Sequence, residues 1–188
     1  MTAAQQMSRA KLYKRYPLAN ILIYNGSTVL HFLLGGVGIM LGYSLWKEWA
    51  YGAGIIYLLF AFGEMYVLMP LVVCPKCVYY RLKDGVCISG LNVVSRKVAR
   101  AGKGEDFGQR AQGVLSPNNL YMVSLVLPLL ALIPALVINF SWMLLGVFAV
   151  ILGLLLFRFF VIFPQLACLH CQAKYICPQA GMMGVREK

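Results

Sequence analysis

Apolar residues fall into four long runs along the chain, and short polar stretches separate the runs within each of two pairs. A helix needs about 20 predominantly apolar residues to cross the roughly 30 Å hydrocarbon core of a bilayer. All four runs reach that length, so the pattern predicts an all-α integral membrane protein with four transmembrane helices in two hairpins. The predicted spans are approximately Leu18–Leu45, Trp49–Val73, Leu120–Phe140 and Trp142–Ala167.

The composition agrees with a membrane protein and excludes a soluble globule. Hydrophobic residues make up 61% of the 188 residues and charged residues only 12%, about half the charged share of a soluble domain. The net charge of +11 would suit a nucleic-acid partner, but here the basic residues flank apolar runs. We therefore expect a single membrane domain in contact with the lipid bilayer, and no nucleic acid as partner.

Lysine and arginine are concentrated in the N-terminal segment, in the central loop at residues 78–118 and in the C-terminal tail. The two hairpin turns together hold only Lys47. Loops on the cytoplasmic side of a membrane carry an excess of Lys and Arg. Both termini and the central loop are therefore predicted to be cytoplasmic, in an inner or plasma membrane.

The central loop is too long to be a simple connector. Ile88, Leu91, Val94 and Val98 recur in it at helical spacing, with basic residues on the other faces. This pattern predicts an amphipathic helix on the anionic cytoplasmic leaflet, and the alternative is a solvated basic loop. In either case the basic loop is the expected docking surface for a cytoplasmic or membrane protein partner.

The second and fourth spans carry an internal repeat. Residues Glu64–Cys77 align without gaps to Arg158–Cys171, and each copy has an ionisable residue ten positions before its first cysteine. Each copy also has a proline four positions before that cysteine and a Cys-x-x-Cys motif. We therefore predict two parallel hairpin repeats, at residues 18–77 and 119–177, with their two Cys-x-x-Cys motifs close together.

A third cysteine, Cys87 or Cys177, follows each Cys-x-x-Cys motif, so all six cysteines belong to two clusters. Cytoplasmic thiols seldom form structural disulfides. Metal binding, dithiol redox chemistry and lipidation are the three hypotheses for them. Both motifs follow helix C-termini, where the helix dipole opposes thiolate formation, and a bound cation removes that penalty. The predicted metal ligands are Cys74, Cys77, Cys87, Cys168, Cys171 and Cys177.

The number of cysteines bears on which metal centre is bound. One structural zinc site needs four ligands, whereas two sets of three thiolates suit iron–sulfur clusters that take a further ligand. The cysteine count therefore favours an iron–sulfur cluster over zinc. Candidates for the further ligand are His170, Tyr79 and Tyr175.

Two ionisable residues, Glu64 and Arg158, are expected near the middle of the bilayer. Each lies ten residues before the first cysteine after its span, or roughly 15 Å at 1.5 Å per residue. Their matched depth and opposite charge predict an intramembrane ion pair, and the alternative is a polar pocket for a quinone headgroup or a small solute.

His31 is the only histidine in a predicted span, so it cannot supply both axial ligands of a membrane b-type haem. With Tyr24 and Asn25 it could line a polar pocket, although we expect a packed, hydrogen-bonded histidine.

These features together predict a small integral-membrane redox subunit. Its cytoplasmic-face iron–sulfur or other metal centre would pass electrons between a soluble partner and the membrane, with quinone as one candidate acceptor. The alternatives are a non-catalytic membrane anchor or scaffold with structural zinc, and a carrier for a small solute or a metal.

Overall fold

The protein is described here by a computed structural model that covers residues 11–44, 47–100 and 116–185. Over these ranges the chain is helical and forms no β-strand, and four helices are long and apolar enough to span a membrane. The prediction of an all-α protein with four helices long and apolar enough to span a membrane is confirmed. The four candidate spans run over Leu18–Gly42, Glu48–Lys76, Pro117–Ile138 and Trp142–Cys168.

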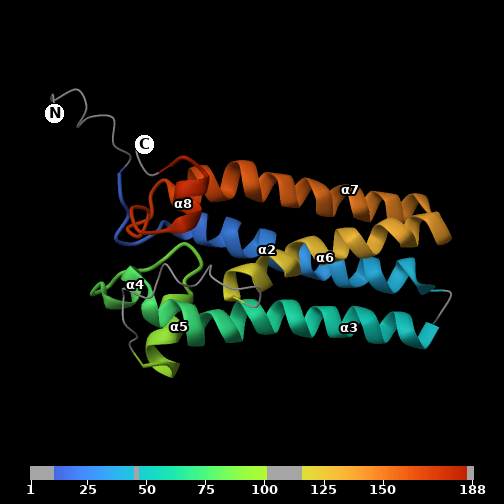
Figure 1. Cartoon of the computed structure of the whole chain (residues 1–188), viewed down its shortest axis with the longest axis horizontal. Helices are drawn as coiled ribbons and strands as arrows, with labels where there is room; N and C mark the ends of the chain where they lie inside the picture. Colours follow the sequence, from blue (N-terminus) through green and yellow to red (C-terminus); the bar gives the residue numbers. More distant parts are fainter. Residues whose placement is uncertain (1–10, 45–46, 101–115, 186–188) are drawn as a thin grey trace.

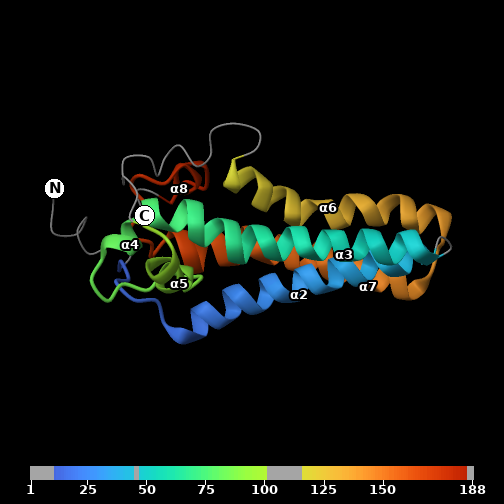
Figure 2. The ribbon, with the colours of Figure 1, turned by 90° about the horizontal axis from the view of Figure 1, so that it is seen from below.

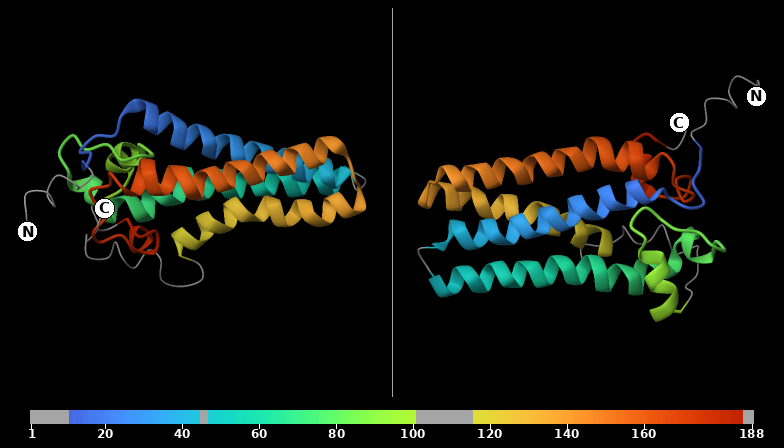
Figure 3. Two further views of the ribbon diagram at one scale, coloured as in Figure 1. Left: turned by 90° about the horizontal axis from the view of Figure 1, so that it is seen from above. Right: turned by 180° about the vertical axis from the view of Figure 1, so that it is seen from behind.

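The spans lie side by side in one bundle (Figure 1). They are built from α2 (Leu18–Gly42), α3 (Lys47–Gly63), α6 (Pro117–Ile138) and α7 (Trp142–Phe157). Helix α2 packs against the other three, and in the view from behind it lies between α7 and α3 (Figure 3).

Small residues allow α2 to approach its neighbours closely. A Cβ atom added to Gly42 would lie 2.6 Å from the Cβ of Ala135 on α6, far inside the 3.5–4.0 Å of an ordinary carbon–carbon contact. This close approach is the kind of contact that small-residue faces provide in membrane helices.

Helix α6 contains Pro128 and Pro134, and each proline removes a backbone N–H donor from the helix. The backbone carbonyls three or four residues before these prolines instead accept hydrogen bonds from side chains. The donor residues belong to α2, to α3 and to the C-cap position that follows α2. Tyr57 donates to the Ser124 carbonyl at 3.0 Å, His31 Nε2 to that of Leu125 at 2.9 Å, and Tyr43 to that of Ala131 at 2.9 Å. His31 is therefore a packed, hydrogen-bonded residue, as expected from the sequence.

The second and fourth spans end in π-helices, η2 (Glu64–Val73) and η5 (Arg158–Cys168). Both begin at the ionisable residue of the sequence alignment, and both contain the aligned proline, Pro70 or Pro164. π-Helices are rare and often occur at functional sites. A 3₁₀ turn, η3 (Cys74–Lys76), follows η2.

The remaining short helices gather at one end of the bundle, opposite the turn that joins α6 to α7 (Figure 2). They are α4 (Val78–Arg81), α5 (Leu91–Val98) and α8 (Pro178–Met182). Leu45, the last residue of the first predicted span, and residues 101–115 of the predicted central loop lie outside the described residues.

Helix α5 coincides with the amphipathic segment predicted in the central loop. It buries Leu91, Asn92 and Ser95 against the bundle, while Val94 is 49% exposed and Val98 58% exposed. The helix is thus present, and its contact with a membrane surface stays a prediction.

Candidate metal centre

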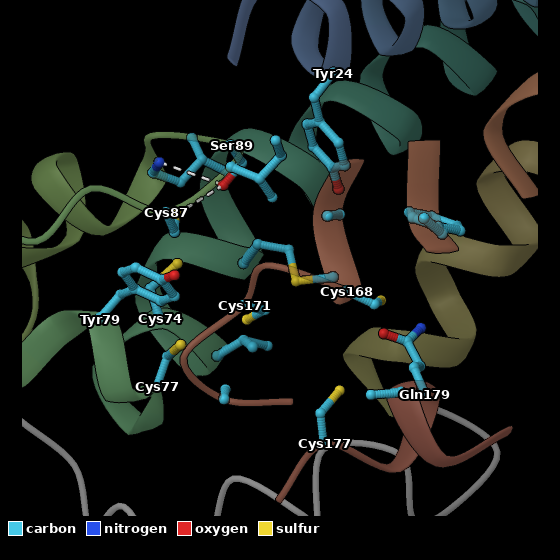
Figure 4. A pocket seen from close by; sticks show the side chains of 18 of the residues that line it. Tyr24, Cys74, Cys77, Tyr79, Cys87, Ser89, Cys168, Cys171, Cys177 and Gln179 are labelled. Carbon is cyan, nitrogen blue, oxygen red and sulfur yellow. Dashed lines mark hydrogen bonds between the residues drawn. The ribbon is translucent and has the colours of Figure 1, made fainter. Parts of the chain in front are cut away.

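All six cysteines line a single cavity of about 190 Å³ at the end of the bundle that holds α4, α5 and α8 (Figure 4). One set of three comes from the chain between η2 and α5, and the other from the last residue of η5 and the chain between η5 and α8. All six are thiols, without a disulfide between them. The structure therefore brings together the two motifs that the sequence alignment expected to be close.

Cys171 occupies a central position among the thiols. It packs, with Cys77 and Cys168, against a buried cluster that includes Cys177. Burial, together with the nearby thiols of Cys77, Cys177 and Cys168, raises the pKa of Cys171 to about 12. A reactive dithiol needs a lowered thiol pKa. The environment of Cys171 raises its pKa and therefore disfavours the redox-dithiol hypothesis for this residue.

The thiols share the cavity without forming a ready-made site for one ion. Thiolates bound to a common ion lie within about 4 Å of each other, because metal–sulfur bonds are near 2.3 Å long. In the ranges that the structure covers, no three Cys, His, Asp or Glu side chains are placed to hold one metal ion. A metal centre in this cavity would therefore have to bridge more widely spaced thiolates or draw them together.

Of the three candidates for an additional ligand, only Tyr79 lines the cavity. Its hydroxyl donates to the Tyr13 carbonyl at 2.7 Å, and burial raises its pKa above the ordinary tyrosine value. His170 instead stacks on the Tyr13 ring and hydrogen-bonds through Nδ1 to the Lys11 carbonyl at 2.8 Å. Tyr175 is half exposed.

The segment before α2 ties the two cysteine-bearing loops together. The Tyr13 N–H donates to the His170 carbonyl at 2.9 Å, and the Val86 N–H donates to the Lys14 carbonyl at 3.1 Å. The Tyr16 hydroxyl adds a bond to the Ala167 carbonyl at 2.5 Å. Sequence reasoning missed this role, because an irregular segment has no periodicity from which such contacts could be predicted.

Helix α5 braces the first cysteine-bearing loop with two polar residues that the sequence did not single out as structural. The buried Asn92 side chain donates to the Gly85 carbonyl at 2.9 Å and accepts from the Cys87 N–H at 3.0 Å. Arg96 donates to the carbonyls of Tyr80 at 3.0 Å, Leu82 at 2.8 Å and Gly85 at 3.1 Å. These bonds position Cys87 at the cavity wall.

The predicted ion pair between Glu64 and Arg158 is wrong. Arg158 is fully buried, and its guanidinium donates to the hydroxyl groups of Tyr121, of Thr28 at 2.5 Å and of Ser27 at 3.0 Å. Glu64 is also buried, yet neither carboxylate oxygen has a hydrogen-bond partner in the described part of the chain. Equal depth along two spans does not determine which way each helix face turns, and here hydroxyl groups of α2 and α6 satisfy the arginine.

Replacing Glu64 by Gln is therefore expected to change the free energy of unfolding by less than about 1 kcal/mol, since the substitution removes no ion pair. Breaking a buried ion pair would cost about 3–5 kcal/mol. Reversible unfolding of the unmodified protein and of Glu64→Gln in detergent micelles distinguishes these two ranges of the free-energy change. A loss in the larger range would mean that Glu64 does pair with a cation.

The candidate pocket of His31, Tyr24 and Asn25 is divided in the structure. Tyr24 lines the cysteine cavity, whereas His31 and Asn25 do not. The Asn25 amide donates to the Ser89 carbonyl at 3.1 Å and so connects α2 to the first cysteine-bearing loop.

Comparisons with known proteins give no relative, since no protein-family model, curated protein or solved structure matches this chain. Functional inference therefore depends on the cavity and the residues around it.

Proposed function

We propose that this protein is a small integral-membrane redox subunit whose cysteines hold an iron–sulfur or other metal centre. The observation that carries the proposal is the convergence of all six cysteines of the chain on one cavity. Cysteines used only as core filler would be scattered over the bundle. Here the ends of two hairpins, far apart in sequence, supply three thiols each.

The number of thiols supports a cluster over a single ion. Iron–sulfur clusters are held by cysteine thiolates. Six thiols also exceed the four ligands of a structural zinc site. The centre would pass electrons between a soluble partner and the membrane.

The one-sided distribution of Lys and Arg supports a cytoplasmic location for the cysteine end. In this orientation the exposed Val94 and Val98 of α5 would enter the leaflet surface, and Lys97 and Arg100, also exposed, would meet its anionic headgroups. The basic loop would also receive the soluble partner. The two π-helices that begin at aligned residues support a parallel hairpin repeat.

Purification without oxygen tests this proposal. We expect a brown protein with broad visible absorption that dithionite bleaches, and with iron and acid-labile sulfide bound in a fixed ratio to the chain. A colourless protein with stoichiometric zinc would instead favour the scaffold, in which the metal clips the two cysteine-bearing loops together. Purified protein that holds no metal, even after reconstitution with iron and sulfide, would refute both.

Metal affinity is expected to rise with pH. The raised pKa of Cys171, about 12, keeps this thiol protonated near neutrality, and its proton must leave when the thiolate binds a metal. Zinc binding by the metal-free protein should therefore weaken as the pH falls from about 9 to about 6, with at least one proton released per bound ion. Competition with a chromophoric chelator measures this, and a pH-independent affinity would show that Cys171 is not a ligand.

The predicted orientation can be tested with a membrane-impermeant thiol reagent added to intact cells. Cys74 and Cys168 should stay unlabelled because they would face the cytoplasm. The exposed Ser44, at the opposite end of the bundle, provides a matched control: Ser44→Cys should be labelled from outside. The reverse pattern would overturn the orientation.

A further inference from the structure

The cavity has a second end, built from aromatic residues of the spans. Tyr24 of α2, Tyr121 of α6 and Phe163 of η5 line this end, and all three are buried within the bundle. Figure 4 shows the Tyr24 hydroxyl pointing into the cavity from the side opposite Cys77 and Cys177. The cavity therefore offers thiols at one end and aromatic rings with a hydroxyl group at the other.

A buried cation lies beside this end of the cavity. The Arg158 guanidinium donates to the Tyr121 hydroxyl, and Tyr121 and Tyr24 both line the cavity. Hydrogen bonds from a charged donor are stronger than those between neutral groups.

Arg158 also lies over the rings that form this end. Its guanidinium carbon is 5.3 Å from the centre of the Tyr24 ring, 5.9 Å from that of Tyr121 and 5.8 Å from that of Phe163. Full burial of this cation gives the aromatic end a positive potential within an otherwise apolar wall. The ligand that fits is flat and apolar, with an oxygen acceptor that gains electron density.

We infer that this aromatic end binds the ring of a quinone, with one ring carbonyl accepting from the Tyr24 hydroxyl. Tyr24, Tyr121 and Phe163 all belong to the candidate spans, where lipid-soluble quinones reside. The inference rests on the proposed function, since it names the acceptor class for the electrons of the thiolate centre.

The test uses the full chain in lipid nanodiscs and a benzoquinone that carries a short alkyl tail. Calorimetric titration should show one saturable site, and Tyr24→Phe should weaken binding about tenfold, the value of one hydrogen bond. Tyr57→Phe is the matched control, because Tyr57 is another buried span tyrosine and lies outside the cavity lining. Its affinity should equal that of the unmodified protein.

A second ligand isolates the role of the carbonyl group. An alkylbenzene with the same tail should bind at least about tenfold more weakly than the quinone, because it cannot accept from Tyr24. Equal affinity of the two ligands, or equal affinity of Tyr24→Phe and the unmodified protein for the quinone, would overturn the inference. If Tyr24→Phe does not fold, a photoreactive quinone should label peptides of α2, α6 and η5, and labelling confined to other helices would also overturn it.

The quinone site and the metal centre can fail separately. Quinone binding by a protein that never takes up metal would retain the aromatic site and refute the redox centre. Stoichiometric metal without saturable quinone binding would retain the metal centre and refute the aromatic site.

Discussion

Replacing Cys171 by Ser is expected to remove the metal centre and to cause the largest loss of stability of any single substitution in the cavity. Cys171 is the thiol that packs with Cys77, Cys168 and Cys177, so it contacts both halves of the site. The binding free energy of a thiolate metal site is also folding free energy, about 10–16 kcal/mol for structural zinc. The loss should therefore exceed the roughly 0.5–3 kcal/mol of an ordinary substitution.

Metal analysis and thermal unfolding, each with and without a chelator, measure this effect. The chelator should destabilise the unmodified protein and have no effect on Cys171→Ser. Ala173→Ser provides a matched control, since it places the same hydroxyl group at a buried position of the same loop and removes no thiol. Wild-type metal content in Cys171→Ser would show that this residue is not a ligand.

Replacing Gly42 by Ala is expected to give the largest effect in the bundle itself. The added methyl group would lie 2.6 Å from the Cβ of Ala135, and a Cβ atom cannot move without its backbone. The substitution therefore forces α2 and α6, and with them the two hairpins, apart. Overpacking of this kind costs about 1–3 kcal/mol, and separation of the hairpins should also weaken metal binding at the far end.

Gly146→Ala is the matched control for this substitution. Gly146 lies inside α7 with nothing within 4 Å of an added Cβ, so alanine should be neutral or stabilising there, by up to about 1 kcal/mol. In detergent micelles, the free energy of unfolding of Gly42→Ala should be well below that of the unmodified protein and that of Gly146→Ala. Equal stability of the two variants would mean that α2 and α6 do not meet at Gly42.

The sequence by itself determined the four spans and their pairing into hairpins. A bilayer leaves no water for backbone groups, so a spanning segment must be a continuous apolar helix whose length can be counted along the chain. Turn lengths then decide which helices are antiparallel neighbours. The spacing of Pro70 and Pro164 before the Cys-x-x-Cys motifs was likewise a local property, and it correctly placed the two motifs at one end of the bundle.

Helix rotation and non-local contacts were decided only by the tertiary structure. The expected depth of Glu64 and Arg158 followed from counting residues along each span. The hydrogen-bond partners of Arg158, in contrast, depend on which faces of α2 and α6 turn toward it. The amphipathic pattern located α5, yet Asn92 and Arg96 proved to brace a loop through backbone carbonyls that no sequence pattern marks. The periodicity of apolar residues indicates which residues share a face of one helix. A cavity, in contrast, exists only where several elements meet. For this reason the joining of thiols and tyrosines around one cavity could not be derived from the sequence alone.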